Sequence, residues 1–166
     1  MIIVMMGVAG SGKTTIGKLL ASNLSWQFAD ADDFHSAANV EKMRSGMPLT
    51  DDDRWPWLER LRSLLSSWIQ SSTHGVLACS ALKQTYRDRL KVSDEVRFVY
   101  LKEEEALLRE RLQVRPGHYM KSGMLDTQLA TLEEPHDALT VDASRTPAEI
   151  VEEIKAGLTL SSQGEN

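Results

Sequence analysis

The sequence predicts an α/β fold, in which a parallel five-stranded sheet is covered by helices on both faces. Short apolar runs, rich in branched and aromatic residues, alternate along the chain with longer stretches of helical periodicity. Nearly unbroken apolar runs are typical of strands that are buried on both faces. Strand–helix alternation favours a parallel sheet, because each helix carries the chain back to begin the next strand in the same direction. With 166 residues, the chain is expected to form one domain over residues 1–166.

The strands are predicted from five apolar runs. These runs occupy residues 2–6, 26–30, 75–81, 96–101 and 138–143. Because they are short and few polar residues interrupt them, they fit buried strands better than helices.

Three helices have clear signals of their own. The first is expected from about residue 13 to residue 23, directly after a glycine-rich turn. The second covers residues 54–69, where apolar residues recur at three- and four-residue spacing: Trp57, Leu58, Leu61, Leu64, Leu65 and Trp68. The third is expected to begin after Thr146, since Pro147 at its first position and Glu149 at the capping-box position form a start signal.

Composition and charge exclude several classes of protein. The formal net charge of −5 disfavours nucleic acid as a partner, because binding the phosphate backbone needs a basic surface. The single cysteine, Cys79, cannot form an internal disulfide and is interpreted as a small buried hydrophobe. The opening run "MIIVMM" is too short for a signal peptide or a membrane span. We therefore expect a cytoplasmic protein with no membrane partner.

The stretch "GVAGSGKTT", residues 7–15, matches the P-loop pattern in full. Its glycines allow the backbone N–H groups to form a nest around an anion, and the next helix presents its positive end to the same anion. Lys13 adds a full charge on the outer phosphates, and the Thr14 hydroxyl is a ligand for Mg²⁺. The predicted nucleotide-binding residues are Gly7, Ala9, Gly10, Ser11, Gly12, Lys13, Thr14 and Thr15.

Among P-loop proteins, a small-molecule kinase fits best. The N-K-x-D and D-x-x-G strings of regulatory GTPases do not occur, and the third apolar run ends in small residues instead of the Asp of an ATPase motor. A kinase also needs an acceptor site beside the γ-phosphate. In "FADADDFH", Asp30 and Asp32 lie two apart and would face the same way on a strand, whereas Asp33 would face away. One carboxylate can orient the acceptor hydroxyl and take its proton, and the other can hold a magnesium-bound water. We favour Asp32 as the base and Asp30 on the metal side, against the alternative of an exposed acidic turn.

Five further segments give the chain a resemblance to the gluconate kinases, small relatives of the nucleoside-monophosphate and shikimate kinases. They are "DADDFH", "KMRSGMPLTDDDRWPWL", "CSALKQTYRDRL", "RPGHYM" and "QLATLEEP", in the order typical of that family. The chain departs from the usual pattern at Ala9 and Thr14, where many members have serine, but Thr14 keeps the hydroxyl. The resemblance implies a three-layer P-loop kinase fold with a small mobile lid, and transfer of the γ-phosphate of ATP to the 6-hydroxyl of D-gluconate with Mg²⁺. It also implies a cytoplasmic homodimer.

Gluconate is a polyol anion, so its site needs a cation and polar groups. Arg54, at the start of a helix, can hold a carboxylate with two parallel hydrogen bonds; the alternative is a surface arginine paired with Asp51 or Asp53. Trp55 and Trp57 are expected mainly in the core. The remaining candidates for substrate contacts are His35, Ser80, Lys83 and Arg87, with Lys83 and Arg87 placed on one face of a helix. For His35, a structural role in a turn is an equal alternative.

The mobile lid is expected at about residues 109–128. Arg111 and Arg115 lie four apart on a predicted helix and so share a face, and Pro116-Gly117 should end that helix. In the monophosphate-kinase relatives, lid arginines close over ATP and neutralise the transferred phosphoryl group, which identifies these two as catalytic and ATP-binding candidates. His118 and Gln128 are expected on the acceptor side. Residues 144–147 follow the last predicted strand, where relatives hold adenine.

Three other functions remain as alternatives. A shikimate kinase shares the P-loop and the D-x-D pattern, but it typically carries consecutive glycines after the third strand, and no Gly-Gly occurs in this chain. A nucleotide or adenylylsulfate kinase is a second alternative. The third is a regulator that binds a nucleotide without catalysis.

Overall fold

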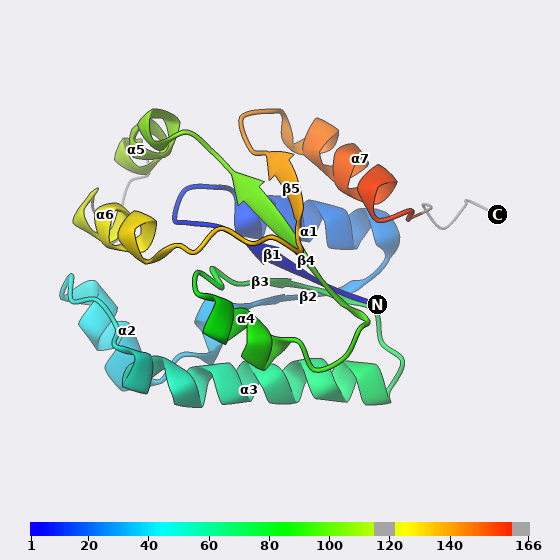
Figure 1. Cartoon of the computed structure of the whole chain (residues 1–166), viewed down its shortest axis with the longest axis horizontal. Helices are drawn as coiled ribbons and strands as arrows, with labels where there is room; N and C mark the ends of the chain where they lie inside the picture. The colour runs from blue at the N-terminus through cyan, green and yellow to red at the C-terminus, as the bar shows by residue number, and fades with distance from the viewer. Residues whose placement is uncertain (115–121, 161–166) are drawn as a thin grey trace.

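The computed structural model, which describes residues 1–114 and 122–160, contains a five-stranded parallel sheet. The strands are β1 (Ile2–Met6), β2 (Gln27–Asp30), β3 (Gly75–Ala78), β4 (Val96–Lys102) and β5 (Leu139–Asp142). Their order across the sheet is β2-β3-β1-β4-β5, so β1 is the central strand. The predicted α/β class and all five strands are confirmed, and Figure 1 shows the strands running toward one common edge.

Helices cover both faces of this sheet, as predicted. The helices are α1 (Lys13–Leu24), α2 (Ala37–Arg44), α3 (Asp51–Gln70), α4 (Gln84–Leu90), α5 (Glu105–Gln113), α6 (Ser122–Thr131) and α7 (Pro147–Gly157), with a short 3₁₀ helix η1 (Ala31–Phe34). In Figure 1, α1 and α7 pack on one face, and α3 and α4 pack on the other. Helices α2, α5 and α6 lie beyond the carboxyl ends of the strands, where ligands of such sheets bind.

Two capping boxes set the starts of α3 and α7. Thr50 and Asp53 bond reciprocally at the start of α3, so this helix begins three residues before the predicted position. Thr146 and Glu149 form the same arrangement at the start of α7, with Pro147 in the first turn, as the sequence predicts. The early start of α3 places Arg54 within its first turn and carries it toward the carboxyl edge of the sheet.

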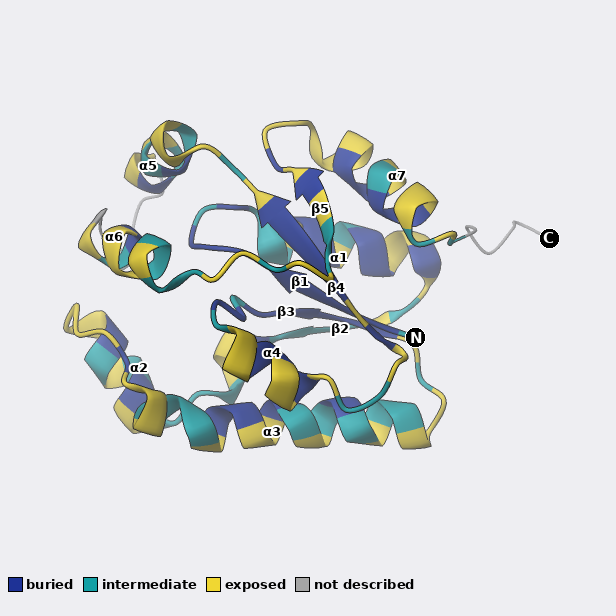
Figure 2. Cartoon of the chain, viewed as in Figure 1, coloured by how far each residue is buried: buried dark blue, intermediate teal, exposed yellow. Residues whose placement is uncertain are grey.

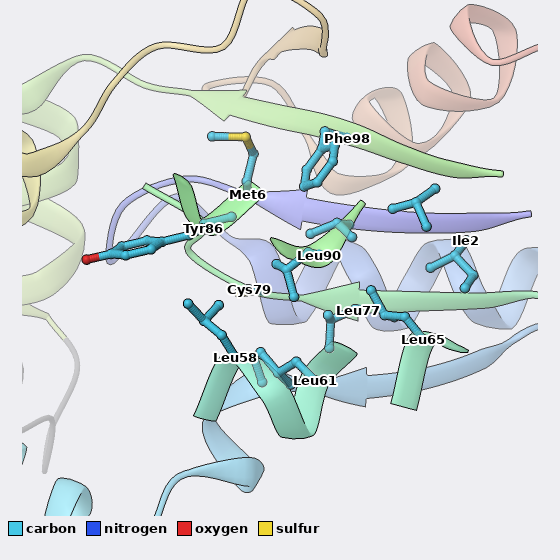
Figure 3. Packing of buried hydrophobic residues seen from close by; sticks show 14 of the residues in the cluster. Ile2, Met6, Leu58, Leu61, Leu65, Leu77, Cys79, Tyr86, Leu90 and Phe98 are labelled. Carbon is cyan, nitrogen blue, oxygen red and sulfur yellow. The ribbon is translucent and has the colours of Figure 1, made fainter. Parts of the chain in front are cut away.

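The apolar core lies in two layers, one on each face of the sheet. Figure 2 shows the central strand β1 buried along its length, and the neighbouring strand β4 is buried except at Arg97 and Lys102. Figure 3 shows the layer under α3 and α4, where Leu58, Leu61 and Leu65 are fully buried beside Leu77 of β3. Truncating one of these leucines to alanine would cost about 2–5 kcal/mol. Trp57 belongs to this core and is 4% exposed, whereas Trp55 is partly buried and packs against it.

A third, smaller apolar cluster joins α5 and α6 to the glycine-rich loop. Leu108 and Leu112 of α5 and Leu125 of α6 pack against Val8 and Ala9. The described part of the predicted lid is therefore packed on the loop in this structure. Within the described residues, no helix is long and apolar enough to span a bilayer.

Candidate active site

The glycine-rich loop connects the central strand β1 to the amino end of α1. Gly7, Gly10 and Gly12 have φ angles of 148°, 85° and 95°, which non-glycine residues rarely adopt. At Gly7 a Cβ atom would lie 2.8 Å from Ser11 Oγ and 3.0 Å from the Leu101 carbonyl oxygen, so the tight turn also requires the absence of a side chain. The Lys13 ammonium folds back over the loop and donates to the Val8 carbonyl at 3.0 Å. The positive φ angles of the glycines and the position of the Lys13 ammonium over the loop are compatible with the predicted phosphate site.

A cavity of about 130 Å³ opens above this loop. It is lined by most of the predicted nucleotide-binding residues and by groups from β2, β3 and α6: Ala9, Gly10, Gly12, Lys13, Thr14, Thr15, Asp30, Asp32, Ala78, Cys79, Ser80 and Gln128. We call it the donor cavity. Gly7 and Ser11 are buried beneath the loop and do not line it. Cys79 is 2% exposed, and burial raises the pKa of its thiol to about 12, so it behaves as the small hydrophobe expected.

The two predicted acidic residues reach the donor cavity by a different route from the one expected. Strand β2 ends at Asp30, and the chain turns at once into η1, so Asp32 is not on the strand and the argument from strand alternation is wrong. Asp30 Oδ1 instead accepts from the Asp32 backbone N–H at 3.0 Å and so caps this turn. The turn brings the Asp32 side chain to the cavity all the same.

Asp30 and Thr14 form the pair that was predicted to hold a metal. The Thr14 hydroxyl donates to Asp30 Oδ2 at 2.7 Å, which leaves the hydroxyl's lone pairs directed away from that bond. Mg²⁺ prefers oxygen ligands and commonly keeps several waters beside one or two protein groups and substrate phosphates. A hydroxyl and a carboxylate beside a phosphate nest fit that chemistry. Within the described ranges, no cluster of three or more His, Cys, Asp or Glu residues suggests a cage made by protein alone.

A second cavity adjoins the first. It is lined by residues of η1, α2, α3 and α6 and of the segments between them: Asp32, His35, Met43, Pro48, Leu49, Arg54, Trp57, Ser80, Leu82, Met124, Thr127, Gln128 and Thr131. We call it the acceptor cavity. Asp32, Ser80 and Gln128 line both cavities, so the two meet at these residues. Gln128 Oε1 also accepts from the Ala9 backbone N–H at 2.7 Å, which links α6 directly to the glycine-rich loop.

Arg54 and His35, both predicted to contact substrate, line the acceptor cavity. The Arg54 guanidinium donates to the Leu49 carbonyl at 2.7 Å and to the Tyr86 hydroxyl at 3.2 Å, and it makes no ion pair with Asp51 or Asp53. The His35 ring stacks on Trp57 at 4.3 Å between centroids. Burial, with the nearby positive charges of Arg54 and Arg60, lowers the pKa of His35 to about 4. His35 is therefore neutral at physiological pH and can donate or accept a hydrogen bond.

Two expected substrate contacts, Lys83 and Arg87, are not brought to the acceptor cavity. Lys83 is the residue before α4, not part of its first turn, and its ammonium bonds both oxygens of Asp51 at 3.1 and 3.2 Å. Arg87 is 2% exposed, and its guanidinium donates to the carbonyls of Ala81, Leu82 and Glu133 and to the Gln84 side chain. These bonds hold the chain around Arg87, and its side chain lines neither cavity, which argues against the predicted substrate contact.

Arg111 lies on the far side of the glycine-rich loop from the acceptor cavity. It donates to the Ala143 carbonyl at 3.0 Å and to the Gly10 carbonyl at 3.4 Å, and it pairs with the buried Glu103 carboxylate at 3.1 Å. A further cavity there is lined by Gly10, Ser11, Gly12, Thr15, Ile16, Arg111, Ala143, Arg145, Pro147 and Ile150. This position matches the predicted adenine side at residues 144–147, but Arg111 does not line the donor cavity. Arg115 and His118 lie outside the described residues.

Sequence reasoning missed several residues of the site. Met43, Pro48 and Leu49 line the acceptor cavity, although the segment that contains them was used only for the resemblance. Tyr86 contacts Arg54, and Glu103 pairs with Arg111. The sequence signal for Tyr86 is its place in the segment "CSALKQTYRDRL". Glu103 has no such signal, because it is one of three consecutive glutamates and nothing in the sequence distinguishes it from the other two.

A glycine nest after the central strand of a parallel sheet, joined to a second cavity through a carboxylate, defines a P-loop kinase. Comparisons with known proteins agree. A family model described as shikimate kinase matches residues 9–159. The chain is 46% identical over 168 residues to a probable gluconokinase of Dictyostelium discoideum, covering 93% of this chain and 84% of that protein. It is 43% identical over 156 residues to a gluconokinase of Gluconobacter oxydans, covering 92% and 88%. The crystal structure of a gluconokinase from Sinorhizobium meliloti superposes with a TM-score of 0.85 at 44% identity, covering 95% of this chain and 90% of that one. The chain belongs to the gluconokinase family, within the shikimate kinase-like P-loop kinases.

Proposed function

We propose that this protein transfers the γ-phosphate of ATP to the 6-hydroxyl of D-gluconate, giving 6-phospho-D-gluconate and ADP in sugar-acid catabolism. One observation carries the proposal: the donor and acceptor cavities meet at Asp32, Ser80 and Gln128. A phosphoryl group held on the glycine-rich loop would then face an acceptor held beside Arg54. The relatives named gluconokinase supply the identity of the acceptor.

On the donor side, the chain would act through position and charge. The backbone N–H groups of the loop and the Lys13 ammonium would surround the phosphates, and charge spread over the transferred group would be offset by these donors. Thr14 and Asp30 would hold Mg²⁺, directly and through water. The chemistry that the ion would supply there is positive charge that offsets part of the negative charge of the phosphates.

On the acceptor side, Asp32 would accept a hydrogen bond from the 6-hydroxyl and take its proton as the bond to phosphorus forms. Arg54 would hold the gluconate carboxylate, because a guanidinium can donate two parallel bonds to it. Neutral His35, Ser80 and Gln128 would contact hydroxyls of the polyol. This assignment orients the chain of the substrate, with its carboxylate toward α3 and its far hydroxyl toward the loop.

The remaining parts of the proposal lie at the edges of the site. Arg111, with Arg115 beyond the described residues, would close over ATP and exclude water, which limits wasteful hydrolysis. Arg111 would do this from the nucleotide side of the loop. We also propose that the protein forms a homodimer. A measurement of its molecular mass in solution tests this.

The first experiment measures ADP release with Mg²⁺, ATP and a panel of acceptors: gluconate, shikimate, adenylylsulfate and nucleoside monophosphates. We expect turnover with gluconate well above that with the others. Turnover with another compound of the panel and none with gluconate would show that this compound, and not gluconate, is the acceptor. ATP binding without ADP release in any mixture would favour a regulator that binds nucleotide without catalysis.

The second experiment tests the junction residue. Asp32→Asn should lower kcat about 10²- to 10⁴-fold, because the group that orients and deprotonates the hydroxyl is lost. ATP affinity should remain close to that of the wild type. Asp33→Asn is the matched control, since Asp33 is the exposed neighbour and lines neither cavity. Loss of ATP affinity in Asp32→Asn with kcat retained would place Asp32 on the metal instead.

A further inference from the structure

Tyr86 connects Arg54 to a charged pair at the rim of the acceptor cavity. Its hydroxyl accepts from Arg54 Nη1 at 3.2 Å and donates to Asp51 Oδ1 in a short hydrogen bond. Lys83 bonds the same carboxylate at 3.1 Å. Both cations also lie over the phenol ring: Arg54 Cζ is 5.5 Å and Lys83 Nζ 5.6 Å from its centroid. The phenol is therefore the centre of a group made of Asp51, Arg54, Lys83 and Tyr86.

These bonds hold one end of the Arg54 guanidinium. Nη1 is bonded twice, to the Leu49 carbonyl and to the Tyr86 hydroxyl. Across residues 1–114 and 122–160, Nε and Nη2 of Arg54 donate to no protein acceptor. Nε and Nη2 are the pair that binds a carboxylate side-on with two parallel bonds. Fixing Nη1 therefore leaves the binding edge of the guanidinium free and limits the directions in which it can point.

Tyr86 is itself firmly placed. It lies on α4, is 2% exposed, and belongs to the apolar cluster between α4 and α3. Figure 3 shows its ring leaving that cluster with the hydroxyl directed away from the buried leucines. Burial and the bond to Asp51 raise the pKa of Tyr86, so the phenol is neutral at physiological pH. A neutral hydroxyl has one proton, which it uses to donate a hydrogen bond to Asp51, so its lone pairs are left to accept the bond from Arg54.

We propose that Tyr86 is a positioning residue for the acceptor carboxylate: it aims Arg54 from outside the cavity and so helps select acidic acceptors. Tyr86 does not line the acceptor cavity and would not touch the substrate. Asp51 and Lys83 act through it, because their charges fix the direction of the hydroxyl. This inference rests on the proposed function, in which Arg54 binds the gluconate carboxylate.

The test removes only the hydroxyl. Tyr86→Phe keeps the ring and its packing, and we expect the KM for gluconate to rise about tenfold, as for the loss of one well-placed hydrogen bond. The KM for ATP and kcat should change less than about twofold. Tyr100→Phe is the matched control, because Tyr100 is a tyrosine buried in the same cluster and lines neither cavity.

A double-mutant cycle distinguishes positioning from a purely structural role. In an Arg54→Lys background, Tyr86→Phe should change the KM for gluconate by less than about twofold, because the guanidinium on which it acts is gone. An equal rise of the KM for gluconate in both backgrounds, or an unchanged KM in Tyr86→Phe, would overturn the inference about Tyr86. The proposed function would still stand if the wild-type protein phosphorylates gluconate. If Tyr86→Phe does not fold, the test uses Asp51→Asn, which changes the exposed side of the group. This variant should also raise the KM for gluconate, and an unchanged KM would refute the positioning role of Tyr86. Absence of gluconate turnover in the wild type would overturn both proposals.

Discussion

Replacing Arg87 by methionine should destabilise the protein without a selective effect on substrate binding. The guanidinium makes four hydrogen bonds, to the carbonyls of Ala81, Leu82 and Glu133 and to Gln84 Oε1. Methionine fills the volume of the aliphatic stem but donates no hydrogen bond. The Leu82 carbonyl keeps its bond from the Glu133 backbone N–H at 2.8 Å, and the other three acceptors lose the bond from Arg87. Ala81 and Leu82 are 1% and 3% exposed, so water cannot replace the lost bonds there. At about 1 kcal/mol for each bond, we expect a loss of about 3–4 kcal/mol in the free energy of unfolding.

Urea denaturation followed by tryptophan fluorescence measures this loss, and it corresponds to a decrease of about 10 °C in Tm. Arg89→Met is the matched control on the same helix. Its side chain is half exposed and pairs with Glu59 at 3.2 Å, so the cost should stay below about 1 kcal/mol. If Arg87→Met were as stable as the wild type and raised the KM for gluconate, the reasoning would fail and Arg87 would be a substrate contact after all.

Two further predictions concern stability and nucleotide binding. Because the pKa of His35 is lowered to about 4 in the folded protein, the unfolded chain binds the extra proton first as the pH falls from 6.5 toward 4. The contribution of His35 to the free energy of unfolding is therefore full above pH 6.5 and declines below it, by about 1–2 kcal/mol after allowance for partial exposure. Denaturation curves at pH 7 and pH 5 measure this decline, and His35→Gln should remove the part that His35 causes. A decline of the same size in the variant would show that other groups cause it. Gly7→Ala should cost about 2–4 kcal/mol and abolish measurable ATP binding by calorimetry, because its Cβ would lie 2.8 Å from Ser11 Oγ. Gly46→Ala, at φ 77° with no atom within 4 Å of the new Cβ, should lower the free energy of unfolding by only about 1 kcal/mol. If Gly7→Ala and Gly46→Ala lowered it equally, the steric argument would be contradicted.

The strands and the long helices could be predicted because their signals are local. Each strand is a short apolar run, and α7 begins at a capping box that four residues define. The errors arose where a side chain's direction depends on the residue at which an element ends. Strand β2 ends at Asp30, so Asp32 left the expected alternation; α4 begins at Gln84, so Lys83 left the expected helix face.

The burial of Arg87 could not be predicted for a different reason. Its acceptors include the Glu133 carbonyl, which is remote in the sequence and is placed by the chain that follows α6. No periodicity within "CSALKQTYRDRL" distinguishes an arginine that faces a ligand from one that faces such a segment. The same limit applies to Tyr86, whose partners Arg54 and Asp51 come from α3.

The two halves of the site therefore differ in what builds them. The core of the donor half is a run of consecutive residues with their backbone N–H groups, placed by the turn between β1 and α1, and groups from β2, β3 and α6 complete its lining. The acceptor half is made of side chains from η1, α2, α3 and α6, each placed by tertiary packing. Substitutions such as Tyr86→Phe, which remove a hydrogen bond that positions Arg54, should then change acceptor affinity while ATP affinity stays constant. Within residues 1–114 and 122–160, only Asp32, Ser80 and Gln128 line both cavities, so any cooperativity between ATP and acceptor binding should depend on these three residues.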